Sequence, residues 1–130
     1  MSARTFNLTM PVHELMNLND ERSLHRMVRS RRVHQIRAAA ASVAAGVPLM
    51  VGPVTIEAQF QWANAHIRDS SNWFPTVKAM VDGLVDAGVL PRDDDRTVRH
   101  TGIGVDLPPQ PGLKGYAQIV LTIEEVEAVR

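Results

Sequence analysis

The sequence predicts a single α+β domain in which two main helices pack on one face of a mixed β-sheet. The chain has 130 residues, with 45% hydrophobic and 22% charged residues, which is typical of one globular domain. Segments that alternate polar and apolar residues are interspersed with segments of helical period. Their order along the chain is strand, helix, strand, helix, strand, strand, which favours an α+β layer arrangement.

The N-terminal half predicts one strand and one long helix. Residues 5–10 (TFNLTM) alternate polar and apolar side chains as a strand does, and Pro11 ends it. Residues 11–21 are rich in Asn and Asp and are expected to form a loop that closes on a helix N-terminus. A continuous helix is predicted over 21–45, followed by Gly46 and Pro48. Its expected apolar stripe is Leu24, Met27, Val28, His34, Ala38, Ala41 and Ala45.

The C-terminal half predicts one helix and three strands. Residues 53–62 (PVTIEAQFQW) alternate most regularly, and a polar connection over 63–72 follows. A helix begins near Pro75 and ends before Gly88, and its apolar stripe is Val77, Met80, Val81, Leu84 and Val85. The remaining elements are a loop over 91–96, a strand over 97–105, a proline-rich loop, a central strand over 116–123, and a charged end or short helix over 124–130.

Composition excludes several classes of site. The chain has no cysteine, so disulfides and thiolate metal sites are excluded, and this suits a reducing cytoplasm. The first ten residues lack the apolar run of a signal peptide, and the alanine-rich stretch over 38–52 is too short and too weakly apolar to span a bilayer. We therefore expect a cytoplasmic protein. P-loop, GxGxxG and GxSxG patterns are also missing, so nothing predicts a nucleotide cofactor.

A basic segment suggests contact with nucleic acid. The formal net charge is zero, but residues 22–37 hold six arginines and two histidines with no acidic residue. Arginine binds phosphate in a planar, bidentate geometry. The DNA-binding candidates are Asn17, Asn19, Arg22, His25, Arg26 and Arg29. A basic helix that is simply solvated explains the same residues equally well, so both interpretations stay open.

Carboxylates flank the second helix. Asp69 precedes it, and an aspartate run over 93–95 follows it. A helix of about thirteen residues spans about 20 Å. The two acidic ends therefore meet only if the loop after Gly88 folds back along the helix, or if the flanking strands are antiparallel neighbours. Together these carboxylates would suit Mg²⁺, with Lys78 over a bound phosphate.

A simpler interpretation uses the same residues structurally. Asp69 or Asn72 caps the helix, Lys78 pairs with Asp82 four residues later, and the aspartate run is a solvated turn. The residues alone favour this interpretation.

A resemblance reverses that preference. The stretch RDSSNWFPTVKAMVDGLVDAGVLPRDDDRTV, residues 68–98, resembles the core motif of the RusA-type Holliday junction resolvases, especially the versions carried by bacteriophages. Those proteins have an R-D-x-x-N segment, a helix with K-A-x-x-D-G-L-x-x-A-G, and an aspartate cluster ending D-D-x-x-V. The segment LNDERSLH is similar to the family's Asn-rich segment, and AQIVLTI is similar to its closing strand.

The resemblance implies a RusA-like α+β fold, a homodimer and a cofactor, Mg²⁺ or Mn²⁺. It implies an endonuclease that resolves four-way DNA junctions by paired nicks, in DNA recombination, repair or phage DNA processing. The implied catalytic residues are Asp69, Lys78 and Asp95, and the implied metal ligands are Asp69, Asp94, Asp95 and Asn72. Arg68 of the R-D-x-x-N segment joins the DNA-binding candidates.

One position departs from the family pattern. Ser71 stands where the family has a second aspartate, and about three extra residues separate Asn72 from Lys78. A serine hydroxyl is a poor substitute for a carboxylate ligand. This leaves two alternatives: a junction-binding protein with weak or lost cleavage, and a protein–protein interaction module on the same fold.

Overall fold

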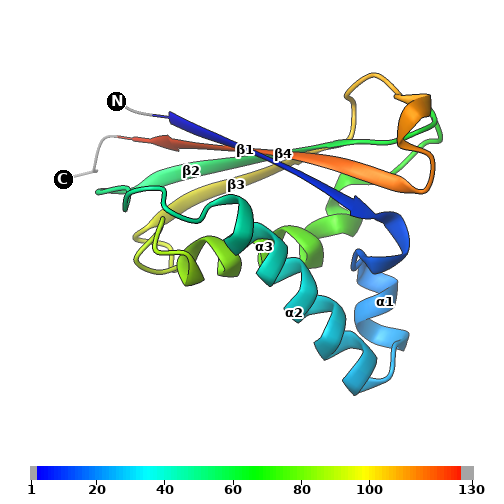
Figure 1. Cartoon of the computed structure of the whole chain (residues 1–130), viewed down its shortest axis with the longest axis horizontal. Helices are drawn as coiled ribbons and strands as arrows, with labels where there is room; N and C mark the ends of the chain where they lie inside the picture. The colour runs from blue at the N-terminus through cyan, green and yellow to red at the C-terminus, as the bar shows by residue number, and fades with distance from the viewer. Residues whose placement is uncertain (1–2, 127–130) are drawn as a thin grey trace.

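A four-stranded sheet forms one layer of the protein, and helices form the other (Figure 1). The computed structural model describes residues 3–126. The strand order is β1-β4-β2-β3, with bounds Ala3–Pro11 (β1), Tyr116–Glu125 (β4), Val54–Gln61 (β2) and Val98–Gly104 (β3). β4 is antiparallel to both of its neighbours, whereas β2 and β3 are parallel. The predicted mixed sheet and the central place of the last strand are confirmed.

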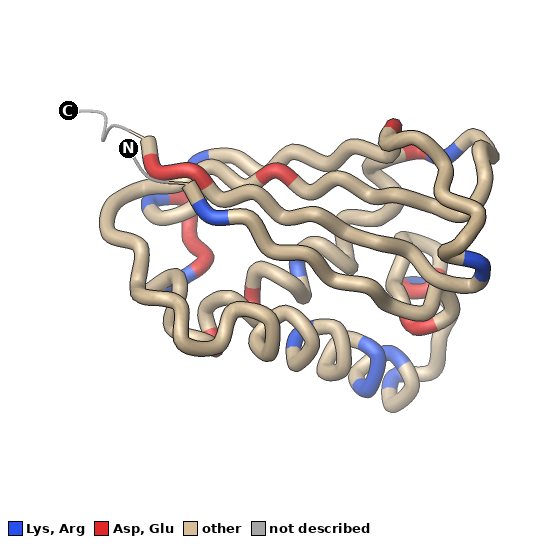
Figure 2. Tube along the Cα trace, turned by 45° about the horizontal axis from the view of Figure 1, so that its top comes forward, with Lys and Arg blue, Asp and Glu red and all other residues tan. Residues whose placement is uncertain are grey.

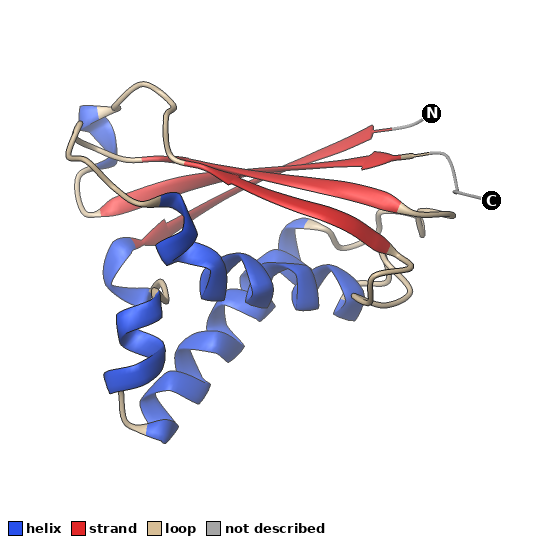
Figure 3. Cartoon of the chain, turned by 180° about the vertical axis from the view of Figure 1, so that it is seen from behind, coloured by secondary structure: helices blue, strands red, loops and turns tan. Residues whose placement is uncertain are grey.

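The core lies between the sheet and the helices, and the alternation of the strands builds it. Successive side chains of a strand point to opposite faces. The buried face carries Phe6, Leu8 and Met10 of β1, alternate residues from Val54 to Phe60 of β2, and alternate residues from Ala117 to Ile123 of β4. Burying each of the larger side chains contributes roughly 1.5–3 kcal/mol. α2 and α3 cover this face (Figure 3).

The predicted continuous helix over 21–45 is wrong, because the chain forms two helices there. These are α1 (Leu18–Ser23) and α2 (Arg26–Val43), and a short 3-10 turn, η1 (Val12–Glu14), precedes them. Leu24 and His25 have extended backbone with ψ of 143° and 141°, which interrupts the helix. The His25 imidazole then caps α2, since its Nδ1 accepts a hydrogen bond from the Met27 N–H at 3.1 Å. α1 also begins three residues before the predicted start.

The predicted apolar stripe of this helix is also wrong, except at Leu24, which is partly buried against the core. The buried residues of α2 are Ile36 and Ala40, and Ala44 follows at the same four-residue spacing. Met27 is 71% exposed, and His34, Ala38 and Ala45 are exposed as well. The reason is geometric: the N-terminal part of α2 projects away from the sheet, so only its second half is covered (Figure 3).

The second helix, α3 (Phe74–Asp86), follows the prediction closely. Val77, Met80, Val81 and Leu84 are buried, and Val85 is partly buried. A 3-10 turn, η2 (Ser70–Trp73), leads directly into α3. At Gly83, α3 packs tightly on α2.

The rest of the chain differs from the prediction only in detail. A 3-10 turn, η3 (Pro111–Leu113), lies within the proline-rich loop. Glu124 and Glu125 continue β4 rather than forming a helix, and residues 127–130 of the predicted tail lie outside the described residues. Within residues 3–126, no helix is both long and apolar enough to cross a membrane.

Candidate active site

A cleft of about 210 Å³ lies between α3 and the edge strand β3. Its apolar wall is formed by Phe74, Val77, Val81 and Val98. Its polar groups come from α3, from the loop over 91–96 and from β3, and they are Lys78, Asp93, Asp95 and Thr101. The cleft therefore combines a cationic group, two carboxylates and a hydroxyl over an apolar floor.

The loop after α3 reaches this cleft by folding back along the helix. Lys78 lies in the second turn of α3, yet its Nζ donates a hydrogen bond to the Asp93 carboxylate. The other route that the sequence left open, antiparallel flanking strands, does not occur, since β2 and β3 are parallel. The β2–α3–β3 unit is instead a crossover connection between parallel strands.

Lys78 is held between two carboxylates. Its Nζ also donates to Asp82 Oδ1 at 2.8 Å, so the simple i,i+4 pair is confirmed. Burial alone lowers the pKa of Lys78, but the hydrogen bonds to Asp82 and Asp93 outweigh it, and the pKa is raised above its ordinary value. The hydrogen bond from Lys78 is the main cause that lowers the pKa of Asp93. Lys78 and Asp93 are consequently charged at neutral pH.

The other two residues of the aspartate run have different surroundings. Asp94 Oδ1 accepts the backbone N–H groups of Arg96 and Thr97, each at 3.1 Å, and so closes the turn that begins β3. Asp95 lines the cleft. Within residues 3–126, its carboxylate has no hydrogen-bond or ion-pair partner, so both oxygens are open to a ligand.

Asp69 caps η2. Its Oδ1 accepts from the Ser71 N–H at 3.1 Å and from Ser71 Oγ at 2.8 Å. η2 contacts both α3 and β3, the two walls of the cleft, but Asp69 does not line the cleft itself. Asn72 lies within η2, and its backbone N–H donates to the Asp69 carbonyl at 3.1 Å. The structure thus brings Lys78 and Asp95 together and places Asp69 and Asn72 on the adjacent turn.

These residues fit a weakly held, hydrated Mg²⁺ rather than an ion in a closed cage. No group of three Asp, Glu or His side chains within residues 3–126 converges on a common point for a metal. Mg²⁺ is nevertheless often bound through one or two carboxylates, with water and substrate phosphate completing its octahedron. The donors with free oxygens are Asp95 and, through Oδ2, Asp69. Asp93 is engaged with Lys78, and Asp94 is engaged through Oδ1 with two backbone N–H groups and through Oδ2 with Arg92 at 3.7 Å.

The basic segment divides into bound and free arginines. Arg29 donates to the Glu21 carbonyl at 2.7 Å, Arg32 lies 3.8 Å from Asp20, and Arg37 forms a two-point pair with Asp86. Three arginines of this segment have no such partner within residues 3–126 and face solvent: Arg22, Arg26 and Arg31. Figure 2 shows the basic residues recurring along α2. A solvated basic helix and a phosphate-binding helix both remain consistent with this surface.

Several predicted DNA-binding residues have structural roles. Asn17 caps α1 in a reciprocal capping box with Asp20, and His25 caps α2. Arg68 lies over the Trp62 ring at 4.2 Å and donates to Asn64 Oδ1 at 2.8 Å. Burial lowers the pKa of Arg68. The contacts of the Arg68 guanidinium with Trp62 and Asn64 hold the loop over 63–69 in place. Of the remaining candidates, Asn19 is exposed on α1.

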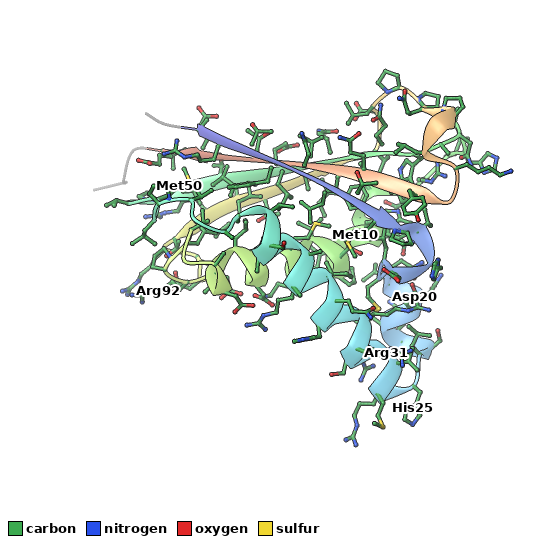
Figure 4. All side chains as sticks on the ribbon, in the orientation of Figure 1. Met10, Asp20, His25, Arg31, Met50 and Arg92 are labelled. Atoms are coloured by element: carbon green, nitrogen blue, oxygen red, sulfur yellow. The ribbon has the colours of Figure 1, made fainter. Side chains whose placement is uncertain are left out.

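Arg31 is a residue that the sequence did not single out. It lines two surface hollows, one with Arg26 and His34 and one with His13 and Arg32. Figure 4 places Arg31 on the part of α2 that projects away from the sheet, and His25 at the N-terminal end of that part. The sequence showed an arginine cluster, but only the contacts of Arg29 and Arg32 with α1 and of Arg37 with α3 separate its bound members from its free ones. Nothing in the sequence distinguished Asp93 from its neighbours or placed Phe74 in the cleft.

No protein-family model matches the chain, and a search of curated proteins finds no match. Three features of the chain bear on its function: the cleft between α3 and β3, the basic surface of α1 and α2, and the motif over 68–98.

Proposed function

We propose that the chain is a divalent-metal-dependent endonuclease that nicks branched DNA, as the RusA-type resolvases do. The observation that carries this proposal is the loop over 91–96, which folds back on α3. It puts Lys78 and Asp95, two residues of the motif, into one cleft. A lysine beside an open carboxylate is an arrangement that suits a phosphodiester and a hydrated metal ion.

The roles follow from the chemistry of each group. Lys78 is charged at neutral pH and binds the scissile phosphate as a compact cation. Asp95, with Asp69 from the adjacent turn, would hold the metal. When bound, Mg²⁺ or Mn²⁺ supplies a water of lowered pKa and neutralises charge that develops on the phosphate. Thr101 donates or accepts a hydrogen bond at the cleft wall.

The free arginines of α1 and α2 would contact the backbone of a DNA arm. Arg22, Arg26 and Arg31 are exposed, and Arg31 lies on a part of the molecule remote from the loop that carries Arg92 (Figure 4). Three phosphate contacts predict a salt slope of about −2.7 for duplex binding. Paired nicks in a four-way junction require two active sites, which a two-fold homodimer supplies.

A synthetic four-way junction with each strand labelled in turn tests the proposal. In Mg²⁺ or Mn²⁺ we expect symmetric nicks in opposed strands, and no nicks in a linear duplex of the same sequence. Asp95→Asn and Lys78→Ala should each reduce the nicking rate at least about a hundredfold, whereas Asp106→Asn, an exposed acidic residue outside the cleft, should not. Absence of paired nicks in either metal, or full activity of Asp95→Asn, contradicts the proposal.

A second candidate is a junction-binding protein without cleavage. The observation that favours it is the engagement of Ser71 with Asp69, at the position where the family has a second carboxylate. This candidate predicts salt-sensitive junction binding that is independent of metal and gives no products. Junction cleavage by the unaltered chain rejects it.

A further inference from the structure

The Lys78 ammonium is already occupied in the free protein. It donates to Asp82, which lies one turn further along α3, and to Asp93, which comes from the loop over 91–96. We propose that Asp93 occupies the place on Lys78 that a DNA phosphate takes, and that DNA enters the cleft by displacing Asp93. The inference rests on the proposed role of Lys78 as the phosphate-binding group.

Asp93 is the replaceable partner of the two. A carboxylate oxygen and a phosphate oxygen accept the same charge-assisted hydrogen bond from an ammonium group. Asp82 belongs to the helix that carries Lys78, and its side chain is 24% exposed, so it is the less accessible of the two carboxylates. The Asp93 side chain is 38% exposed and lies in a loop. A phosphate that reaches Lys78 from solvent therefore meets Asp93 first.

The loop is anchored on one side of Asp93. The Val98 N–H donates to the Asp94 carbonyl at 2.8 Å, and the Asp94 side chain accepts two further backbone N–H groups. Thr97 is buried, and its carbonyl accepts from Val54 at 2.7 Å. These bonds hold residues 94–98 to the start of β3. Asp93 can leave Lys78 by rotation of residues 91–93 while Asp95 keeps its place in the cleft.

The charges at the cleft explain what this contact does. Lys78 contributes +1, and Asp82, Asp93 and Asp95 together contribute −3, so the net charge is 1 − 3 = −2. A phosphodiester is repelled by such a site. Withdrawal of Asp93 reduces the net charge to −1, and binding of a divalent cation would change the net charge to +1. Asp93 thus adds to the repulsion that a phosphate meets when no cation is bound.

Binding without metal tests the inference. Anisotropy of a fluorescent four-way junction is measured in EDTA at low salt for the wild type, Asp93→Asn and Asp106→Asn. The two variants change the net charge equally, but Asp106 does not line the cleft. We expect Asp93→Asn to bind about three- to fivefold more tightly, the upper range for release of an exposed ion pair, and Asp106→Asn to differ little from the wild type. Adding Lys78→Ala should remove the advantage of Asp93→Asn.

The outcomes separate this inference from the proposed function. Equal affinities of Asp93→Asn and Asp106→Asn, or an advantage that survives Lys78→Ala, overturn the displacement of Asp93. If the wild type nicks junctions in Mg²⁺ under that result, the endonuclease proposal stands alone. If Asp93→Asn binds more tightly through Lys78 but no protein nicks in either metal, the displacement stands and cleavage is rejected. Absence of junction binding by all the proteins overturns both.

Discussion

Gly83→Ala tests the contact that sets the distance between α2 and α3. A Cβ at this position would lie 2.8 Å from the Ala40 Cβ and 3.1 Å from the Ala41 nitrogen, and closer still to the Arg37 carbonyl oxygen. Because two of these atoms belong to the backbone of α2, rotation of a side chain cannot relieve the clash. The helices must separate, which costs about 3 kcal/mol, the upper part of the range for overpacking.

The intrinsic helix preference of alanine offsets part of this cost. Alanine is favoured over glycine in a helix interior by about 1 kcal/mol. We therefore expect a net loss of about 2 kcal/mol in the free energy of unfolding. For a chain of this length, that corresponds to a fall in Tm of about 6–10 °C.

Urea unfolding followed by tryptophan fluorescence measures this change, since Trp62 and Trp73 lie in one aromatic cluster of the core. The matched control is Gly112→Ala, because a Cβ there meets nothing within 4 Å. It should change stability by less than about 0.5 kcal/mol. A Gly83→Ala variant that is as stable as the wild type, with an unchanged m-value, would refute the close packing of the two helices.

Three further predictions concern other contacts. Thr76→Val should cost about 2–4 kcal/mol in urea unfolding, because it leaves the buried Met16 N–H and carbonyl, now bonded at 2.8 and 2.7 Å, without partners; a loss below 1 kcal/mol contradicts it. The hydrogen bond from Arg37 lowers the pKa of Asp86. The stabilisation that this ion pair contributes is therefore complete above the ordinary pKa of 3.8, and it is lost as the pH falls through the lowered pKa of Asp86. Asp86→Asn should therefore be less stable than the wild type at pH 6, and the difference should vanish in acid; a constant difference argues against the pair. Arg31→Ala should reduce the salt slope of junction binding by about 0.9, and an unchanged slope excludes a phosphate contact there.

The sheet was predictable because its signal is local. Polar and apolar residues alternate over 5–10 and 53–62, which is the pattern of a strand with one buried face. In the structure the apolar face of each strand is buried. The break between α1 and α2 was not predictable, since neither glycine nor proline marks it. The break is accompanied by a side-chain cap: the His25 imidazole accepts a hydrogen bond from the backbone N–H of Met27, two residues further along the chain. The stripe on α2 failed because periodicity cannot tell how much of a helix the sheet covers.

The candidate site was predictable in its residue types but not in its assignments. The motif located Lys78 and the aspartate run, and the structure places Lys78, Asp93 and Asp95 at one cleft. The separate surroundings of Asp93, Asp94 and Asp95 arise from the loop that folds back on α3. One carboxylate pairs with Lys78, one caps a turn, and one faces the cleft. Three identical residues in a row carry no local signal that distinguishes these positions.

A net charge of zero is compatible with the proposed DNA binding because the charges are separated in space. The free arginines lie on α1 and on the N-terminal part of α2, and the excess of carboxylates lies around the cleft. Arg37 and Asp86 join the two helices that carry these surfaces, and the close approach at Gly83 fixes their distance. DNA held by α2 would therefore meet the negative cleft at a set spacing. Under the proposed function, duplex binding should tolerate loss of the metal, whereas entry of the scissile phosphate should not.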